Sequence, residues 1–477
     1  MSHKKVIIIT YYWPPSGGSG VQRWLKMAKY LPQFGWEPVV FTPENPELMA
    51  RDEALLHEVS PNLKVWKLPI FEPYNLYKIF TGKRGETVKP GYISDYTDNT
   101  GNIHNIHNIH NTRNTRNTRN THSPPDPTPK QQGGRKESRQ PWKERLSLFI
   151  RGNFFFPDPR CFWRRPSVRY LVKRLKEEPV DCIITTGPPH SMHLIGKDLH
   201  RKTGIPWMAD FRDPWTGFYY FKHLKMLPFT VKRHKRAEQA VVSEADIVTV
   251  VSPQMRREFL PLNPKKVEVI PNGYDESDFA VEAKRFDGKF TITHTGLFTR
   301  DANPDRLWQA LAEIVAENEA FAQALNIVLV GQTDNAIKRS VEEAGLLPFC
   351  RFVPYVPHLE AVAYQKGANL LLLTLKKEPE SKGIITGKLF EYLAAGKPIL
   401  AIGPVEGDLS EILTECNGGT MHEFEDFEGI KRTILLYFRS FGCDKEWEDS
   451  RPQAIAAYSR QNLCGRVSES LNQLFLK

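Results

Sequence analysis

One stretch of the sequence brings together the residue types that bind a phosphate group. Residues 381–400 read SKGIITGKLFEYLAAGKPIL, in which a glycine-containing loop precedes a helix that we expect to begin near Lys388. The unpaired N–H groups and the positive dipole end of a helix N-terminus attract a diphosphate. A carboxylate in the first helical turn can accept hydrogen bonds from ribose hydroxyls. The stretch therefore predicts a site for a nucleotide diphosphate, and its expected residues are Lys382, Gly383, Thr386, Gly387, Lys388 and Glu391.

A second group of polar residues follows short apolar runs in the N-terminal half. His190 comes after the run 182–185, and Asp210, Arg212 and Asp213 lie at or just after the run 207–210. Polar residues at the carboxyl ends of buried strands are typical of ligand sites in α/β sheets. A structural interpretation is also open, in which His190 caps the following helix and Arg212 pairs with Asp213.

Strands and helices alternate around these residues, as an α/β fold requires. The opening run 6–10 is apolar and β-branched without polar alternation, which is typical of a strand buried on both faces. A glycine-rich loop at 13–20 and a helix at 21–31 follow it. We expect further strands at 38–42, 182–185, 207–210, 246–251, 290–295, 326–330, 351–353, 369–375 and 398–402, and helices at 304–318, 335–344 and 388–395. This order predicts two Rossmann-like domains.

A hinge and an insertion divide the chain. The Pro and Gly of the segment 270–274 are typical of a hinge, so we expect domains at 1–275 and 276–447, followed by a helical segment at 448–477. Between about 81 and 141 the pattern is lost, and residues 102–119 repeat Asn-Ile-His and then Asn-Thr-Arg. This composition buries too little apolar surface to offset its ordering entropy, which predicts a disordered insertion. Repeat expansion explains the repeated histidines better than a metal site does.

Composition narrows the class of protein without naming a ligand. The net charge of +10 suits an anionic partner, and six cysteines without a C-x-x-C pair predict reduced thiols and no zinc site. These thiols favour a cytoplasmic protein, and because no run reaches the ~20 apolar residues of a membrane span, we expect it to be soluble or bound to a membrane only at its surface. Basic and aromatic residues are interleaved at 142–176, and a basic run at 222–236 follows three aromatic residues. These tracts fit either the surface of an anionic bilayer at the inner face of the plasma membrane or solvated helix faces over a core.

The phosphate-binding stretch resembles a known motif. KLFEYLAAGKPIL is similar to the donor-site motif of the retaining glycosyltransferases of family 4, which have the GT-B fold. That family carries two glutamates in an E-x7-E pattern, and Glu391 matches the second. The first would fall at position 383, where this chain has Gly383. In the family this first glutamate lies by the donor sugar. Because the present chain lacks it, the resemblance does not indicate which sugar the donor carries.

The resemblance covers nearly the whole chain outside the insertion. THTGLFTRDANPDRLWQAL is similar to the loop that opens the family's donor domain, where an arginine and a lysine neutralise the pyrophosphate. Arg300 matches the arginine, and Arg306 is a candidate for the lysine. YYWPPSGGSGVQRW is similar to the first glycine-rich loop, in which Gly17 and Gly18 let the backbone approach donor phosphate or acceptor. His190 matches a histidine of the acceptor side, and the GT-B fold implies a C-terminal helix that returns to the N-terminal domain.

This resemblance implies retaining transfer of a sugar from a nucleotide-sugar donor to a glycan or lipid-linked acceptor in surface polysaccharide synthesis. Arg300, Lys388 and the helix N-terminus would stabilise the leaving diphosphate. No Asp-x-Asp clamp is evident, so we expect no metal and no other cofactor, and no nucleic-acid motif is present. Two alternatives are a GT-B nucleotide-sugar 2-epimerase and a non-catalytic nucleotide-binding scaffold in a glycan-assembly complex. The missing glutamate at 383 favours the scaffold over the epimerase.

Overall fold

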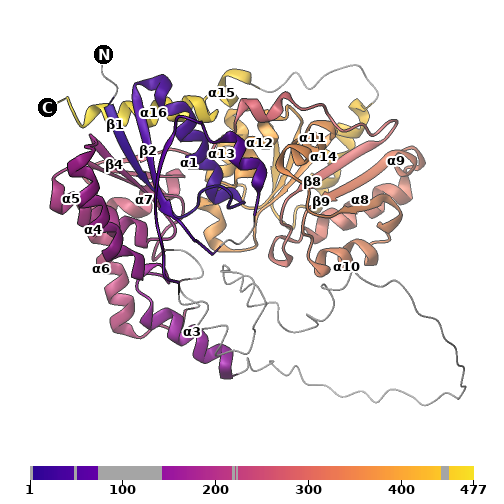
Figure 1. Ribbon diagram of the computed structural model, residues 1–477. Helices are drawn as coiled ribbons and strands as arrows, with labels where there is room; N and C mark the ends of the chain where they lie inside the picture. Colours follow the sequence, from indigo (N-terminus) through magenta and orange to yellow (C-terminus); the bar gives the residue numbers. More distant parts are fainter. Residues whose placement is uncertain are drawn as a thin grey trace, which may run out of the picture.

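The computed structural model describes residues 4–47, 51–72, 142–217, 221, 224–441 and 451–476. These residues form two α/β domains that lie side by side, each built on one parallel sheet (Figure 1). The predicted insertion at 81–141, with its repeats, lies outside the described residues.

The N-terminal sheet alternates buried side chains between its two faces. Its strands are β1 (Lys4–Ile9), β2 (Trp36–Pro43), β3 (Lys64–Leu68), β4 (Cys182–Gly187), β5 (Trp207–Phe211), β6 (Ile247–Val250) and β7 (Val267–Val269). Within the described residues the order is β3-β2-β1-β4-β5-β6-β7, and every neighbouring pair is parallel. In β1, Val6 and Ile8 pack in one core and Ile7 and Ile9 in another. Because both faces are apolar, helices have to cover both.

The C-terminal sheet follows the same plan. Its strands are β8 (Phe290–Thr295), β9 (Leu325–Val330), β10 (Cys350–Val353), β11 (Leu370–Thr374), β12 (Ile399–Ile402) and β13 (Gly419–His422). In the described part of the chain their order is β10-β9-β8-β11-β12-β13, again with parallel neighbours. The strand order reverses between β1 and β4 in the first sheet and between β8 and β11 in the second. Ligands of open α/β sheets bind at such switch points, outside the carboxyl ends of the strands.

Helices cover both faces of each sheet. Those of the N-terminal half are α1 (Ser19–Tyr30), α3 (Trp142–Phe154), α4 (Cys161–Glu177), α5 (Ser191–Thr203), α6 (Pro228–Glu244) and α7 (Pro253–Phe259). Those that follow are α8 (Asp305–Glu317), α9 (Glu319–Ala324), α10 (Asn335–Glu343), α11 (His358–Gly367), α12 (Gly387–Ala394), α13 (Asp408–Glu415), α14 (Phe427–Ser440), α15 (Pro452–Ala456) and α16 (Arg460–Gln473). In the first domain α4, α5, α6 and α7 share one core, and α1 lies on the other face. In the second, α8, α10 and α14 pack on one face and α12 and α13 on the other.

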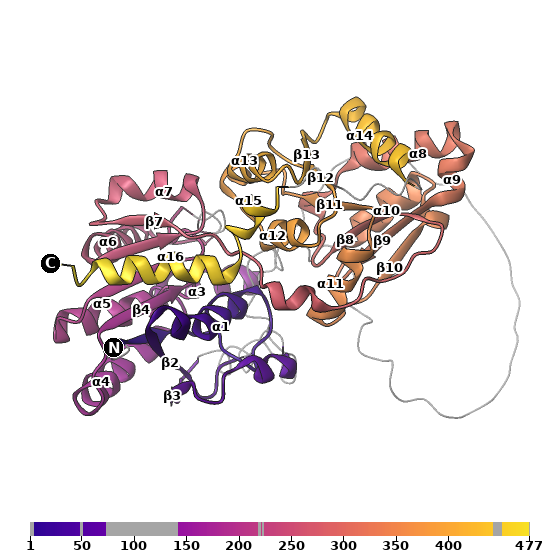
Figure 2. The ribbon, with the colours of Figure 1, turned by 90° about the horizontal axis from the view of Figure 1, so that it is seen from above.

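The C-terminal helix returns to the first domain. Leu463, Val467 and Leu471 of α16 pack in the same core as Trp24 of α1, and Figure 2 shows the two helices side by side. The return begins where the backbone N–H of Arg460 donates to the carbonyl of Tyr274 over 2.7 Å. The predicted α/β GT-B fold is confirmed. The domain boundaries at 275 and 447 stay a prediction, although all strands of the first sheet end before residue 275.

Candidate active site

Lys388 lies at the switch point of the C-terminal sheet. The N-cap residue of α12, Thr386, accepts a hydrogen bond from the backbone N–H of Lys388 over 3.0 Å. The Nζ atom of Lys388 lies 3.0 Å from the carbonyl oxygen of Leu297 and 3.2 Å from Nε2 of His294. These partners belong to the end of β8 and the loop after it, whereas α12 follows β11. The ammonium group is therefore held between the two strands that flank the switch point, beside a helix N-terminus.

Gly296 makes room for this lysine. Its φ of +96° is a conformation that favours glycine, and a Cβ atom there would lie 2.9 Å from Cε of Lys388. Gly387, at the start of α12, has open space on the side where a Cβ would point. The two glycines therefore have different roles, because Gly296 admits the lysine and Gly387 leaves the helix start uncovered.

The protonation states around Lys388 follow from burial. Nδ1 of His294 lies 3.0 Å from the carbonyl oxygen of Leu372, so it carries the proton and leaves the Nε2 lone pair facing Lys388. Burial, and then the charge of Lys388, hold the pKa of His294 well below its usual value. Burial also lowers the pKa of Lys388 to about 8, although the carboxylate of Glu391 opposes this fall. An anion that enters the site would therefore meet a neutral imidazole and a mostly protonated lysine.

Glu391 is oriented from two other elements. Its Oε2 atom accepts a hydrogen bond of 3.0 Å from Gln365 of α11, and the same amide group lies 3.0 Å from Oγ1 of Thr295. The hydroxyl of Tyr392 accepts the backbone N–H of Thr295 over 2.9 Å, which ties α12 to the end of β8. Within the described residues Oε1 of Glu391 has no hydrogen-bond partner, so it is available to hydroxyl groups of a ligand.

Two other predicted donor residues lie at the loop before α12. Lys382 is exposed, and its ammonium nitrogen lies 3.4 Å from a carboxylate oxygen of Glu406. Gly383 ends the short 3-10 helix η9 (Pro379–Gly383), where a Cβ atom would meet Gln254 of the other domain. The structure thus brings Thr386, Gly387, Lys388 and Glu391 together on one helix start and places Lys382 at the surface.

The arginine of the donor loop also lies at the surface. Arg300 begins the short 3-10 turn Arg300–Ala302, which follows the Gly296 loop, and its side chain is exposed. Arg306 forms an exposed ion pair of 2.8 Å with Glu425. Arg306 thus lies away from Lys388 with its own partner, and Arg300 lies three residues beyond Leu297, whose carbonyl oxygen contacts Lys388.

Arg212 connects the loops at the N-terminal switch point. Its guanidinium donates to the carbonyl oxygen of Gly20, in the first turn of α1 just after the glycine-rich loop that follows β1, over 3.1 Å, and also to that of Pro188, in the loop after β4. A Cβ at position 20 would lie 2.7 Å from Nη1 of Arg212, which explains that glycine. Gly17 and Gly18 come just before it, and Gly18 has a φ of +96° with open space beside it. Arg212 therefore positions both loops.

The imidazole ring of His190 is buried and makes no hydrogen bond to any of the described residues. Its ring stacks on Trp215 with centroids 4.8 Å apart, and neither ring nitrogen has a partner among the described residues. It is the N-cap residue of α5, but its side chain makes no capping hydrogen bond, and the backbone N–H of Ser191 donates to Asp158 over 2.8 Å. His193, in contrast, lies 2.9 Å from Oγ1 of Thr185. Burial, and then nearby positive charges, hold the pKa of His190 well below its usual value and keep it neutral.

Asp210 belongs to the interior of the first domain. Its two carboxylate oxygens accept hydrogen bonds of 2.7 and 3.1 Å from Arg23 and of 2.7 Å from the indole of Trp24. Thr186 and Thr249 add two more, of 2.9 and 2.7 Å. Both oxygens are thereby occupied, so any effect of Asp210 on an acceptor would pass through these neighbours. Its acceptor role stays a prediction.

Asp213, the last of the predicted acceptor-side residues, follows β5. Burial raises the pKa of its carboxyl, and the charge of Arg212 opposes that rise. The guanidinium of Arg212 donates to backbone carbonyls, and the described residues show no ion pair between Arg212 and Asp213. A direct role of Asp213 on the acceptor side stays a prediction.

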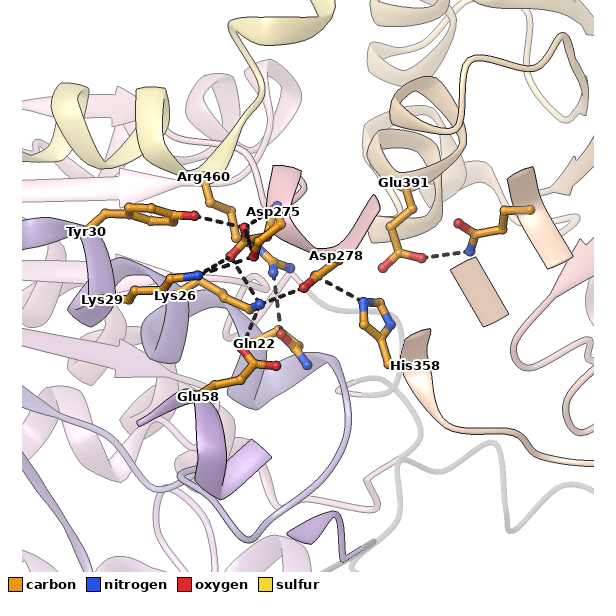
Figure 3. A network of polar contacts seen from close by, with 12 residues as sticks. Gln22, Lys26, Lys29, Tyr30, Glu58, Asp275, Asp278, His358, Glu391 and Arg460 are labelled. Carbon is orange, nitrogen blue, oxygen red and sulfur yellow. Dashed lines mark hydrogen bonds and ion pairs between the residues drawn. The ribbon is translucent and has the colours of Figure 1, made fainter. Parts of the chain in front are cut away.

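A buried polar network joins the two domains at the hinge (Figure 3). The Nζ atom of Lys26 in α1 lies 2.8 Å from Asp278 and 3.1 Å from Asp275, which both follow β7. The other carboxylate oxygen of Asp278 lies 3.2 Å from Nε2 of His358, the first residue of α11. The network therefore runs from the first domain to the helix that carries Gln365, the partner of Glu391.

The sequence predictions did not include several of these residues. His294 has a recognisable signal, because it is a polar residue at the end of an apolar strand. Gln365 and His358 lie in α11, and nothing near them in the sequence indicates a role. Among the described residues no cluster of His, Cys, Asp or Glu side chains is placed to hold a metal ion. The helices described here include none with the length and apolar character that crossing a membrane takes.

Two protein-family profiles match the sequence. The sequence profile of Glycosyltransferase Family 4 matches residues 121–278, and that of Glycosyl transferases group 1 matches residues 275–440. The chain is a family 4-type glycosyltransferase of the GT-B fold. The two matches meet at 275–278, where the hinge network lies. No curated protein matches the sequence at a significant level.

Solved glycosyltransferase structures share the fold at low sequence identity. Sucrose-phosphate synthase from Thermosynechococcus elongatus superposes with a TM-score of 0.58 at 15% identity, over 99% of each chain. The trehalose-phosphate synthase (UDP-forming) of Burkholderia vietnamiensis has a TM-score of 0.58 at 10% identity, also over 99% of each chain. HepE from Anabaena, solved with UDP-glucose, has a TM-score of 0.55 at 12% identity, over 99% of this glycosyltransferase and 100% of HepE.

Proposed function

We propose that this glycosyltransferase retains configuration and transfers a sugar from a nucleotide-sugar donor to a glycan or lipid-linked acceptor in the synthesis of a surface polysaccharide. The observation that supports it most is the position of Lys388, whose ammonium lies beside the N-terminus of α12 with Glu391 one turn further on. A cation, a helix N-terminus and a carboxylate in this order suit the diphosphate and ribose of a nucleotide. HepE, which has the same fold, was solved with UDP-glucose, and we extend this class of donor to the present chain.

In the proposed reaction the acceptor hydroxyl attacks the anomeric carbon on the face from which the diphosphate leaves. The bond between the anomeric carbon and the diphosphate oxygen breaks, and the leaving diphosphate takes the hydroxyl proton. Negative charge grows on that diphosphate, so Lys388, Arg300 and the N–H groups of α12 stabilise the transition state more than the ground state. These groups would make a divalent cation unnecessary. His190, whose neutral ring has no hydrogen-bond partner among the described residues, would hydrogen-bond a substrate hydroxyl.

Titration calorimetry with UDP, GDP and ADP, followed by turnover with their sugar conjugates, tests the proposal. Glu391→Ala should weaken nucleotide binding roughly 10- to 100-fold, because it removes a charged hydrogen-bond acceptor for the ribose. Glu360→Ala is a matched control, since Glu360 is an exposed glutamate of α11. If the wild-type chain neither binds nor turns over any UDP-, GDP- or ADP-sugar, the proposal is wrong. Turnover that persists in EDTA would support the metal-free mechanism.

The two alternatives give different products. A 2-epimerase would convert the free nucleotide sugar into its epimer without an acceptor, which NMR of the nucleotide sugar detects. A scaffold would bind nucleotide without turnover and would keep its cellular role in the Glu391→Ala variant. Gly383 is the observation that favours the scaffold, because a carboxylate expected at the donor sugar is absent.

We also propose that the enzyme acts at the cytoplasmic face of an anionic membrane. Leu146, Ile150 and Phe154 recur every four residues along α3, and 47%, 40% and 70% of their surfaces are exposed. The stripe continues into an aromatic cluster, in which Phe162 lies 6.1 Å from Phe155 and 5.8 Å from Phe71 between ring centroids. The neighbouring α6 carries exposed basic residues at 232, 233, 235 and 236. Apolar and basic groups together fit the interface of an anionic bilayer.

Co-sedimentation with vesicles tests this contact. We expect wild-type protein to bind vesicles that contain phosphatidylglycerol more strongly than pure phosphatidylcholine, and the double variant Ile150→Asp/Phe154→Asp to lose most of this binding. Leu436→Asp is the matched control, because Leu436 is 61% exposed on α14 of the other domain. Equal binding by the double variant and by the control would contradict the proposal.

A further inference from the structure

Position 383 has no room for a side chain. A Cβ atom on Gly383 would lie 2.7 Å from Cγ of Gln254 and 2.9 Å from its Cβ. These atoms are at the root of the Gln254 side chain, so they cannot move aside as the end of a flexible chain would. Gln254 belongs to α7, which begins at the carboxyl end of β6 in the first domain. The space that a glutamate at 383 would enter is therefore filled from the facing domain.

The facing helix is held in place by a buried carboxylate. Oδ2 of Asp408 accepts the backbone N–H of Gln254 over 2.7 Å, and Oδ1 lies 3.3 Å from a guanidinium nitrogen of Arg257. Asp408 is almost fully buried and is the first residue of α13. Just before it, Gly407 packs so closely that a Cβ there would lie 2.7 Å from the carbonyl oxygen of Lys382. The loop of η9, the start of α13 and the start of α7 thus form one contact between the domains.

The side chain that fills this space keeps hydrogen-bonding capacity. Oε1 of Gln254 accepts from Nε of Arg257 over 3.0 Å, and Nε2 donates to Glu258 over 3.0 Å. A carboxamide has two lone pairs and two N–H groups, so one of each is still available. Sugar hydroxyls both donate and accept, and a carboxamide can exchange hydrogen bonds with them in place of a carboxylate.

We propose that Gln254 contacts the donor sugar and takes over, from the first domain, the place that a glutamate at position 383 would hold. This inference rests on the proposed function, because it requires a nucleotide sugar at the start of α12. It gives Gly383 a physical reason, since the glycine admits Gln254. It also makes recognition of the sugar depend on contact between α7 and η9, so that the protein recognises the sugar only when the two domains are in contact.

Binding measurements separate the contribution of the sugar to the affinity from that of the nucleotide. The ratio of the Kd for UDP to the Kd for a UDP-sugar reports the contribution of the sugar, with UDP-glucose and UDP-N-acetylglucosamine as probes. Gln254→Ala should lower this ratio about 2- to 10-fold, the worth of one neutral hydrogen bond. Gln323→Ala is the control, because Gln323 is an exposed helical glutamine that donates over 3.1 Å to a glutamate one turn away, as Gln254 does.

Changing the side chains at positions 254 and 383 together tests whether both would occupy the same space. Gly383→Glu alone should lower the ratio further, because its side chain collides with Gln254. In the double variant Gln254→Gly/Gly383→Glu neither the Cβ nor the Cγ of residue 254 is present, so the glutamate has room, and the ratio should return to at least the wild-type value. An unchanged ratio in Gln254→Ala, or a double variant no better than Gly383→Glu, would overturn the assignment. Failure of wild-type protein to bind UDP at all would instead overturn the proposed function, and the assignment with it.

Discussion

The titration of Lys388 gives the sharpest prediction about the donor site. Burial lowers its pKa to about 8, so a change from pH 7 to pH 9 converts it from mostly ammonium to mostly amine. If a diphosphate binds the protonated form, the association constant scales with the protonated fraction. That fraction falls about tenfold between these two pH values for one group with this pKa. The affinity for UDP should therefore fall about tenfold, because the last ionisation of the diphosphate, with a pKa of about 6, is nearly complete at pH 7 and adds little charge above it.

Calorimetric titration of UDP at pH 7, 8 and 9 measures this fall. At pH 7, Lys388→Met should bind UDP about 10- to 100-fold more weakly, the worth of a charge-assisted hydrogen bond, and it should show almost no further loss at pH 9. Lys338→Met is the control, because Lys338 is an exposed lysine of α10, and this variant should keep both the affinity and the pH slope. A flat wild-type profile, or a Lys388→Met variant with the wild-type slope, would refute the reasoning.

Three further predictions concern the hinge, the core and the repeats. Burial alone would lower the pKa of His358, but its hydrogen bond to Asp278 and nearby carboxylates raise it. The pKa of His358 is thus higher in the folded than in the unfolded chain, so the stabilisation is complete below about pH 6 and is lost as the pH rises through the folded pKa. The difference in Tm between wild type and His358→Gln should therefore shrink from pH 5.5 to pH 8.5. A difference that stays constant over this range would contradict the prediction. Asp210→Asn should lower the free energy of unfolding, measured in urea, by about 3–5 kcal/mol, because it leaves Arg23 buried without its counter-charge. The control variant Asp287→Asn changes an exposed aspartate and should lower it by less than about 0.5 kcal/mol. Deleting residues 102–122 should leave turnover of the nucleotide sugar unchanged, and a loss of activity would show that the repeats have a role.

Buried apolar strands were predictable, whereas three of the edge strands in the described sheets were not. The run 290–295 is the observed β8, and the predicted strands at 326–330 and 398–402 agree with β9 and β12 to within one residue. The sequence predicts no strand at β3, β7 and β13, which lie at the edges of their sheets and keep several partly exposed residues, whereas it predicts the remaining edge strand of the described residues, β10, at 351–353. An edge strand needs less apolar surface than a central one, so its pattern is weaker.

The C-terminal apolar pattern predicts one helical segment, whereas the structure has two helices, α15 and α16. Ile455 of α15 packs with α12 in the second domain, whereas Leu463 and Leu471 of α16 pack in the first. Both segments have helical periodicity, and the sequence does not show which sheet each one covers. The chain crosses between the domains near Ser459, which pairs with Tyr274.

The order of residues along one helix start was enough to predict the phosphate-binding group. Thr386, Gly387, Lys388 and Glu391 lie within two turns, and a helix places such neighbours together whatever the rest of the fold does. Their partners come from far along the chain, because His294 and Leu297 follow another strand and Gln365 lies on another helix. The exclusion of any side chain at position 383 likewise depends on Gln254, more than a hundred residues away and in the other domain. Local spacing thus determined which groups could meet a diphosphate, and only the packing of the two domains decided what surrounds them.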